Sequence, residues 1–166
     1  DEVNSAAGGG FVEVEPGPLG APICGLKALA TTTSAVRIFD NSATGARVAT
    51  AIDRYATEAE ARQSYDQEAT LRTTCADRNY SIDGVSYTVV IIPFDDVIPT
   101  GGREYLGLLI GYSPVLDSST TVAGTVAPQP IYQFVVETVD GANLIGSSYI
   151  TVGRQLTDAE IAGYIQ

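Results

Sequence analysis

The sequence contains no histidine, tryptophan or methionine, and Lys27 is its single lysine. Without histidine the chain cannot assemble a Ser-His-Asp triad or a Cys-His pair. Lys27 has no S-x-x-K context, and the chain has no G-x-S-x-G turn, P-loop or G-x-G-x-x-G dinucleotide motif. These absences predict a protein that is not an enzyme and that binds no cofactor.

Positive charge is also scarce, with 9 basic against 20 acidic residues and a formal net charge of −11 at pH 7. Such a charge repels the phosphate backbone of nucleic acids and anionic membrane surfaces, so neither is an expected partner. The preference for arginine over lysine, with abundant alanine, threonine, glycine and valine, indicates a GC-rich genome. A haloarchaeal origin is the alternative, which the modest share of acidic residues disfavours.

Long apolar runs are missing, because no stretch approaches the roughly 18 residues that a membrane-spanning helix needs. The absence of methionine extends to position 1, which favours a mature or trimmed ectodomain whose signal peptide or anchor lies outside this sequence. Hydrophobic residues make up 45% of the 166, which is enough for one globular domain.

Cysteine occurs twice, and Cys24 and Cys75 favour a disulfide bond over a pair of buried free thiols. The bridge would close a loop of about 50 residues, worth about 4 kcal/mol in the chain-entropy model. Two cysteines without histidine cannot fill a tetrahedral zinc site, so no metal site is expected. A disulfide indicates an oxidising, extracytoplasmic compartment.

The order of expected elements is a strand, a helix, a run of strands and a final helix. Residues 1–15 predict an N-terminal tether, with residues 11–15 as an edge strand or an extended linker, and residues 16–166 predict a single domain. Strands are expected at residues 47–55, 86–92, 104–112, 131–139 and 144–152. Capping boxes begin helices after Thr57 and Thr157, the first running to about Cys75, and a short helix is expected at residues 22–30.

This order predicts an α+β fold: a single domain with a mainly antiparallel sheet of about five or more strands and helices packed on one side. Residues 113–130 interrupt the strands with serine, threonine, glycine and proline. A loop of that length is either functional or mobile.

Two acidic stretches have the residue types of a catalytic or metal site. Asp95 and Asp96 follow a strand end, where the acids of a hydrolase or metal site can lie, but a solvated loop is the favoured interpretation. Residues 77–84 carry oxygen-bearing side chains at alternate positions, as in a calcium loop. They lack the glycine and the final glutamate of such a loop, so a turn leading into a strand is favoured.

Tyrosine is abundant, with nine residues, and Tyr105 and Tyr112 flank a strand marked by Gly107 and Gly111. The missing side chains at the glycines give the hypothesis of a groove that a ligand enters beside these four residues. The bland alternative, that the glycines let a helix pack closely on the sheet, is the favoured interpretation.

Residues 46–153 resemble actinobacterial PknH-like extracellular sensor domains and a related family of envelope lipoproteins. The resemblance lies in a strand ending at Tyr55, an alanine-rich helix ending near Cys75, the sequence Tyr-Ser-Ile-Asp-Gly at 80–84 and a hairpin containing Gly141. It implies an exported, disulfide-bonded domain, secreted or membrane-anchored, with a cleft between sheet and helices that binds a ligand.

Together these features predict a non-catalytic extracytoplasmic sensor-like domain that binds a small, lipid or glycan ligand or an envelope protein partner. The alternative is a scaffold or adaptor subunit of a cell-envelope assembly without a small-molecule pocket. A third hypothesis, a carboxylate-dependent hydrolase using Asp95 and Asp96, is disfavoured.

The cysteine pair gives the first testable prediction. The intact mass of the unreduced protein should be lower than that of the reduced protein by two hydrogen atoms, because Cys24 and Cys75 are expected to be bridged. Neither cysteine should react with iodoacetamide before reduction. Equal masses before and after reduction would remove the main support for an oxidising compartment.

Overall fold

The computed structural model describes residues 9–16, 29–70, 78–82, 85–94, 104–115 and 127–165. Several predicted features lie outside these ranges: Cys24 and Cys75, Asp95 and Asp96, most of the helix at 22–30, and most of the loop at 113–130. The disulfide therefore stays a prediction.

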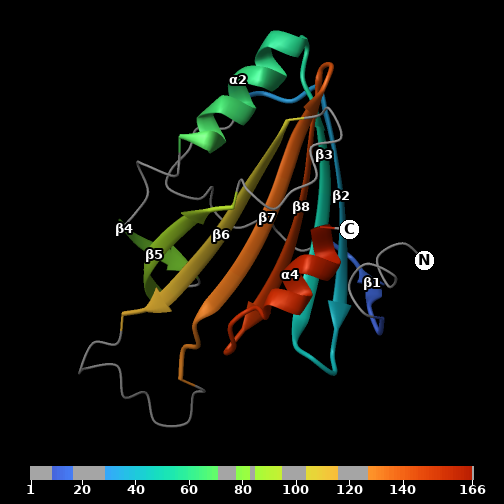
Figure 1. The fold of residues 1–166 in the computed structure, drawn as a ribbon. Helices are drawn as coiled ribbons and strands as arrows, with labels where there is room; N and C mark the ends of the chain where they lie inside the picture. The colour runs from blue at the N-terminus through green and yellow to red at the C-terminus, as the bar shows by residue number, and fades with distance from the viewer. Residues whose placement is uncertain are drawn as a thin grey trace.

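Eight strands form one antiparallel sheet in the order β1-β2-β3-β8-β7-β6-β5-β4 (Figure 1). The strands are β1 Val12–Val14, β2 Thr33–Asn41, β3 Ala46–Arg54, β4 Arg78–Ile82, β5 Val85–Pro93, β6 Tyr105–Pro114, β7 Ile131–Asp140 and β8 Asn143–Val152. The described helices are α2 Glu58–Ala69 and α4 Asp158–Ile165. The prediction of a mainly antiparallel sheet of five or more strands is confirmed.

Successive residues of a strand point to opposite faces of the sheet, and residues paired across two strands point to the same face. The register of the strands therefore assigns every strand residue to one of two faces. One face carries Leu106 and Ile110, and Ala61 and Tyr65 of α2 pack against it; we name it the α2 face. The core on this face contains Tyr55, Ala61, Tyr65, Tyr87, Val89, Ile91, Leu106, Leu108, Ile110, Tyr112 and Leu144.

The opposite face, named the α4 face, has a second core of Phe11, Phe39, Ala46, Val48 and Tyr149, against which Leu156 and Tyr164 pack. The rings of Phe134 and Tyr149 lie 6.1 and 5.7 Å from that of Tyr164 on α4. The two described helices thus cover opposite faces, and the prediction of helices on one side was wrong. The physical reason is that β6 and β8 carry apolar residues on both faces, so each face needs a cover.

Helix α2 begins as its capping box predicts, since the Thr57 hydroxyl accepts from the Glu60 amide at 3.2 Å. The Glu60 carboxylate in turn accepts from the amide of Ala56. The helix ends at Ala69, before the predicted end near Cys75, and Thr70 follows as its C-cap.

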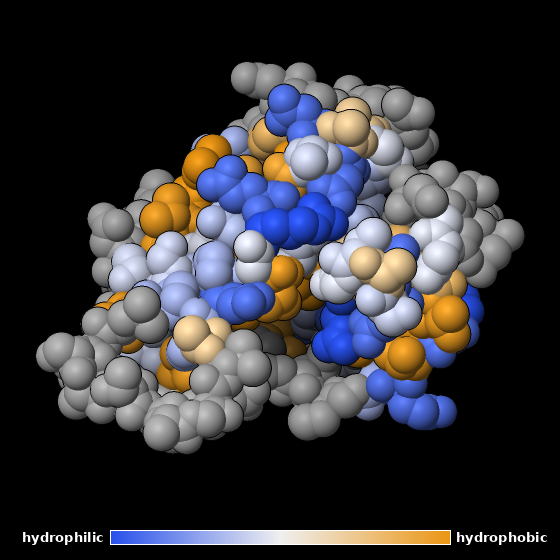
Figure 2. All heavy atoms as spheres, turned by 90° about the horizontal axis from the view of Figure 1, so that it is seen from below, coloured by the Kyte–Doolittle hydropathy of each residue, from blue (hydrophilic) through white to orange (hydrophobic). Residues whose placement is uncertain are grey.

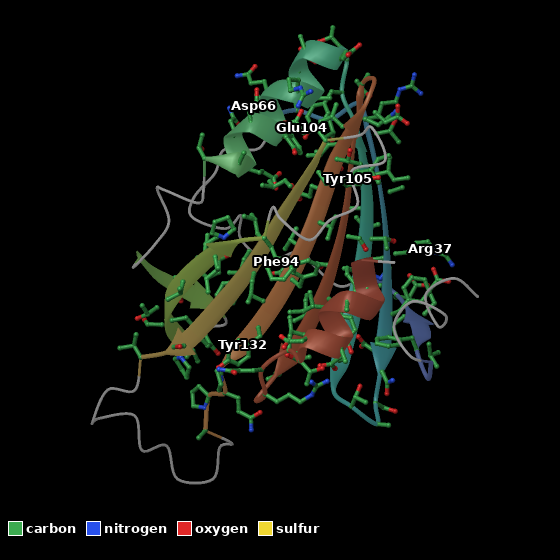
Figure 3. The ribbon with its side chains drawn as sticks, in the orientation of Figure 1. Arg37, Asp66, Phe94, Glu104, Tyr105 and Tyr132 are labelled. Atoms are coloured by element: carbon green, nitrogen blue, oxygen red, sulfur yellow. The ribbon has the colours of Figure 1, made fainter. Side chains whose placement is uncertain are left out.

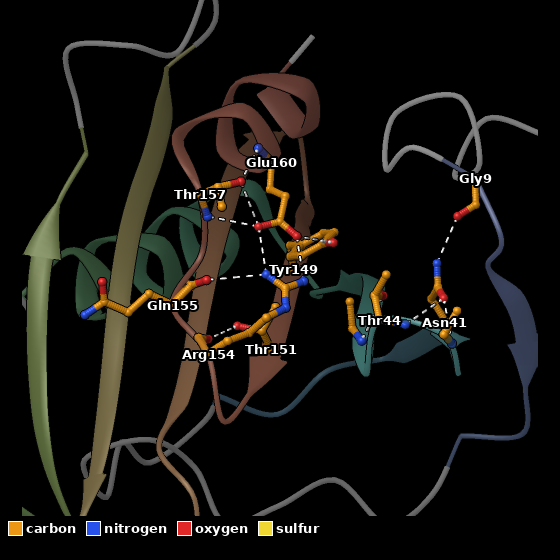
Figure 4. Close-up of polar contacts among 11 residues, drawn as sticks. Gly9, Asn41, Thr44, Tyr149, Thr151, Arg154, Gln155, Thr157 and Glu160 are labelled. Carbon is orange, nitrogen blue, oxygen red and sulfur yellow. Dashed lines mark hydrogen bonds and ion pairs between the residues drawn. The ribbon is translucent and has the colours of Figure 1, made fainter.

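Helix α4 is fixed by a network around Glu160 (Figure 4). Arg154 donates two hydrogen bonds to the Glu160 carboxylate, at 2.9 and 2.7 Å. The amide and hydroxyl of Thr157 donate to the same group, and the Tyr149 hydroxyl donates to it at 3.1 Å. Arg154 first, and then the amide and hydroxyl of Thr157, lower the pKa of Glu160 to about 2.

Sequence reasoning missed two strands, β2 and β4. Strand β2 reads Thr-Ser-Ala-Val-Arg-Ile-Phe-Asp-Asn, and its polar ends resemble loop composition. Strand β4 lies within the stretch weighed as a calcium loop, and it pairs with β5 rather than merely leading into it. Residues 11–15 contain the edge strand β1, one of the two expected outcomes. Among the described helices, none is long and apolar enough to cross a membrane.

Replacing Glu160 with Gln should lower the free energy of unfolding by about 1–3 kcal/mol near neutral pH, because the charged form makes the bonds to Arg154. The folded-state pKa of about 2 lies below the ordinary 4.5, so this stability is present above pH 4.5 and is lost as the pH falls toward 2. Urea unfolding across this range should therefore show the gap between Glu160→Gln and the natural protein closing in acid. The exposed Glu58 provides the control variant Glu58→Gln, and a gap that is constant with pH would contradict the prediction.

Candidate functional site

The four residues proposed for a binding groove do not lie on one face of the sheet. Tyr105, Gly107 and Gly111 point to the α4 face, opposite Thr138, Val136 and Tyr132 of β7. Tyr112 is paired with Ile131 of β7 and points to the α2 face. A single groove lined by all four is therefore not formed.

Tyr112 is a core residue with 4% of its surface exposed. Its hydroxyl donates to Oε1 of Gln133 at 3.3 Å, and its ring lies 6.1 Å from that of Tyr80. Burial raises the pKa of Tyr112. A side chain so enclosed contributes packing and offers little to a ligand from solvent.

On the α4 face, the glycine-marked strand borders an exposed apolar strip. Val90 lies opposite Gly111, and Ile92 lies opposite Leu109, with 46% and 51% of the two β5 residues exposed. We name Val90, Ile92, Leu109 and Gly111 the β5–β6 strip. A Cβ added at Gly111 would lie 3.9 Å from the Tyr132 ring, an ordinary contact, so this glycine is not required by close packing.

Three aromatic residues of this side are spread along the strands rather than gathered round one point. Figure 3 shows Tyr105 near the upper end of β6, Phe94 over the middle of the sheet, and Tyr132 toward the lower end of β7. Phe94 packs on Phe134 at 5.3 Å between ring centroids. These three aromatic residues therefore do not converge on one binding point.

A second candidate site, which the sequence did not reveal, lies on the α2 face where α2 meets the sheet. Glu137 of β7 is opposite Gly146 of β8, and the missing side chain there makes room for it. A Cβ at Gly146 would lie 3.4 Å from both Cγ and Oε1 of Glu137. Glu68, in the last turn of α2, is hydrogen-bonded to the Glu137 carboxyl.

Two carboxyl groups can hydrogen-bond only when one carries a proton. Burial, above all, holds the pKa of Glu137 well above its usual value, and the negative charges of Glu68 and Asp53 add to the shift. Burial also raises the pKa of Glu68, with Asp53 contributing and the bond to Glu137 acting in the opposite direction. At a pH where only one proton is bound to the pair, the two carboxyl groups share it.

One carboxyl oxygen of this pair, Oε2 of Glu137, is shielded from solvent. Glu137 keeps partial exposure as a residue, but its Oε2 is out of contact with solvent. Among the described residues, no N–H or hydroxyl group donates to that oxygen. No group of three or more metal-ligating side chains comes together in the described part of the chain. What the pair can do chemically is to hold and release a proton.

The sequence signal for this site was weak. Glu137 stands inside the apolar run Phe134–Val139, which is an unusual setting for a charge. Glu68 reads as an ordinary exposed helix residue, and only the packing of α2 on β7 and β8 brings the two together.

Comparison with known proteins supports the fold. No protein-family model and no curated protein sequence matches the chain. Among solved structures, it is similar to the crystal structure of the extracellular domain of PknH from Mycobacterium tuberculosis. The TM-score is 0.57 at 10% sequence identity, over 99% of this chain and 89% of that one. At this identity the similarity shows a common fold.

Two glycine variants test the packing of the two sites. Gly146→Ala should give a free energy of unfolding roughly 1 kcal/mol below that of Gly111→Ala, because the new methyl group lies at the lower limit of van der Waals contact with Glu137. Gly111→Ala should be neutral or stabilising by up to about 1 kcal/mol, since alanine restricts the unfolded chain more than glycine does. Urea unfolding of the matched pair measures both, and equal effects would contradict the assigned contacts.

Proposed function

We propose that this chain is a non-catalytic extracytoplasmic domain, sensor-like in architecture, that binds a partner at the cell envelope. The single observation that carries the proposal is the similarity to the extracellular domain of PknH over nearly the full length of both chains. The absence of histidine and of any nucleophile motif supports the non-catalytic part.

The β5–β6 strip is the proposed binding surface. Its apolar side chains stand on an open sheet face, which suits a protein surface better than a small molecule that needs enclosure. Seen from below, hydrophobic residues form separate groups among hydrophilic ones (Figure 2).

Charge limits the kind of partner. With a net charge of −11 at pH 7, the chain attracts a surface that carries basic residues and repels an acidic one. We therefore favour an envelope protein whose apolar patch is bordered by arginine or lysine. A small, lipid or glycan ligand is the alternative occupant.

Native mass spectrometry of the protein isolated from its own cells tests this proposal. The natural protein should carry a bound polypeptide, and Ile92→Asp should lower the bound fraction more than tenfold, because an unpaired charge buried in an apolar interface is costly. The control is Val152→Asp, since Val152 is 51% exposed like Ile92 but lies on the α2 face.

The other outcomes are equally informative. A retained small molecule in place of a polypeptide would replace the partner with a ligand. An equal decrease of the bound fraction in both variants would show that the interface is not the β5–β6 strip. Recovery of the free chain alone would contradict the binding proposal.

A further inference from the structure

The Glu68–Glu137 pair spans the contact between a helix and the sheet. Glu68 belongs to the last turn of α2, and Glu137 to β7 near the centre of the sheet. Nearer its start, α2 is held by buried Ala61 and Tyr65 and by the hydrogen bond from Tyr55 to Ser64 at 2.8 Å. The carboxyl pair is the polar link at the other end of the helix.

We propose that this pair is a proton-operated latch, in which a shared proton holds the C-terminal end of α2 on the sheet and its loss releases that end. The ligand of this site is the proton itself. The inference goes beyond the proposed function, because it requires no partner and concerns the α2 face rather than the β5–β6 strip.

The charges around the pair favour this reading. Besides Glu68 and Glu137 themselves, Asp53 of β3 acts on both groups, and it too is acidic. The arginines on neighbouring described elements are engaged elsewhere or face away. Arg62 of α2 pairs with Glu104 and Arg47 of β3 pairs with Asp40, each at 2.7 Å, and Arg54 of β3 lies on the α4 face. Strand β8 contributes Gly146 and Leu144, which carry no charge.

The direction of the response follows from the raised pKa values of both carboxyls. The pair keeps a proton in the folded protein at a pH where both groups of the unfolded chain, with a pKa of 4.5, have lost theirs. The stability that this gives is complete below pH 4.5 and is lost as the pH rises through the raised values. Acid therefore closes the latch, and a pH above the raised pKa values of the pair opens it.

The first experiment follows the carboxyl carbons of the natural protein by NMR during a pH titration. Glu68 and Glu137 should titrate in linked steps with at least one midpoint above 4.5 by more than about one pH unit, and Glu160 below 4.5 in the same spectra. Midpoints of both Glu68 and Glu137 at 4.5 or below would overturn the proposal. This measurement needs no variant and cannot be confused with misfolding.

The second experiment measures amide hydrogen exchange in α2, normalised for the intrinsic effect of pH. Between about pH 5 and about pH 8 the C-terminal turn of α2 should open roughly tenfold or more, which is the change expected for one pKa unit of differential proton binding. Exchange in α4 should not show this rise. Opening that is equal in both helices would overturn the latch.

Substitutions assign the effect to the pair. Glu137→Gln and, independently, Glu68→Gln should remove the pH dependence of α2 exchange, because an amide hydrogen-bonds without titrating. Asp66→Asn, on the exposed side of the same helix, is the matched control and should retain it. If millimolar calcium or magnesium restored protection of α2 near pH 8 in the natural protein, the pair would be a cation site and the latch would be wrong.

Discussion

Side-chain alternation through one continuous register is the constraint on which this structure depends. Because the strands carry apolar side chains on both faces, each face must be covered, and one helix serves each. The same alternation separates Tyr105 from Tyr112 and leaves the β5–β6 strip beside the area that α4 covers. It also aims Glu137 at α2 rather than at solvent on the other side.

Much of the fold could be predicted from the spacing of apolar residues along the strands and from the capping boxes of the helices. The strands containing Val48, Ile91, Leu108, Phe134 and Tyr149 were found within a few residues of their ends, since each alternates or is rich in β-branched residues. The polar strands β2 and β4 were not, because their pairing partners stabilise them more than their own composition does. Which face a helix covers, and which acids it buries, depends on contacts distant in sequence.

The two helices are attached by carboxyl groups with opposite requirements. Glu160 must be ionised to hold Arg154, whereas Glu68 and Glu137 together must keep a proton. Each face of the sheet therefore has its own response to acidity, and the two attachments coexist fully only in a mildly acidic range.

The pairing of β3 with β8 also has a consequence for how the chain reaches this structure. Arg54 lies opposite Asn143, so these two adjacent interior strands come from distant parts of the sequence. The backbone groups on the inner edge of β3 are paired only after the β7–β8 hairpin has formed. Pairing between segments so far apart in sequence makes folding slow. Until that pairing forms, the β2–β3 hairpin has an open strand edge, where another chain can pair and aggregate.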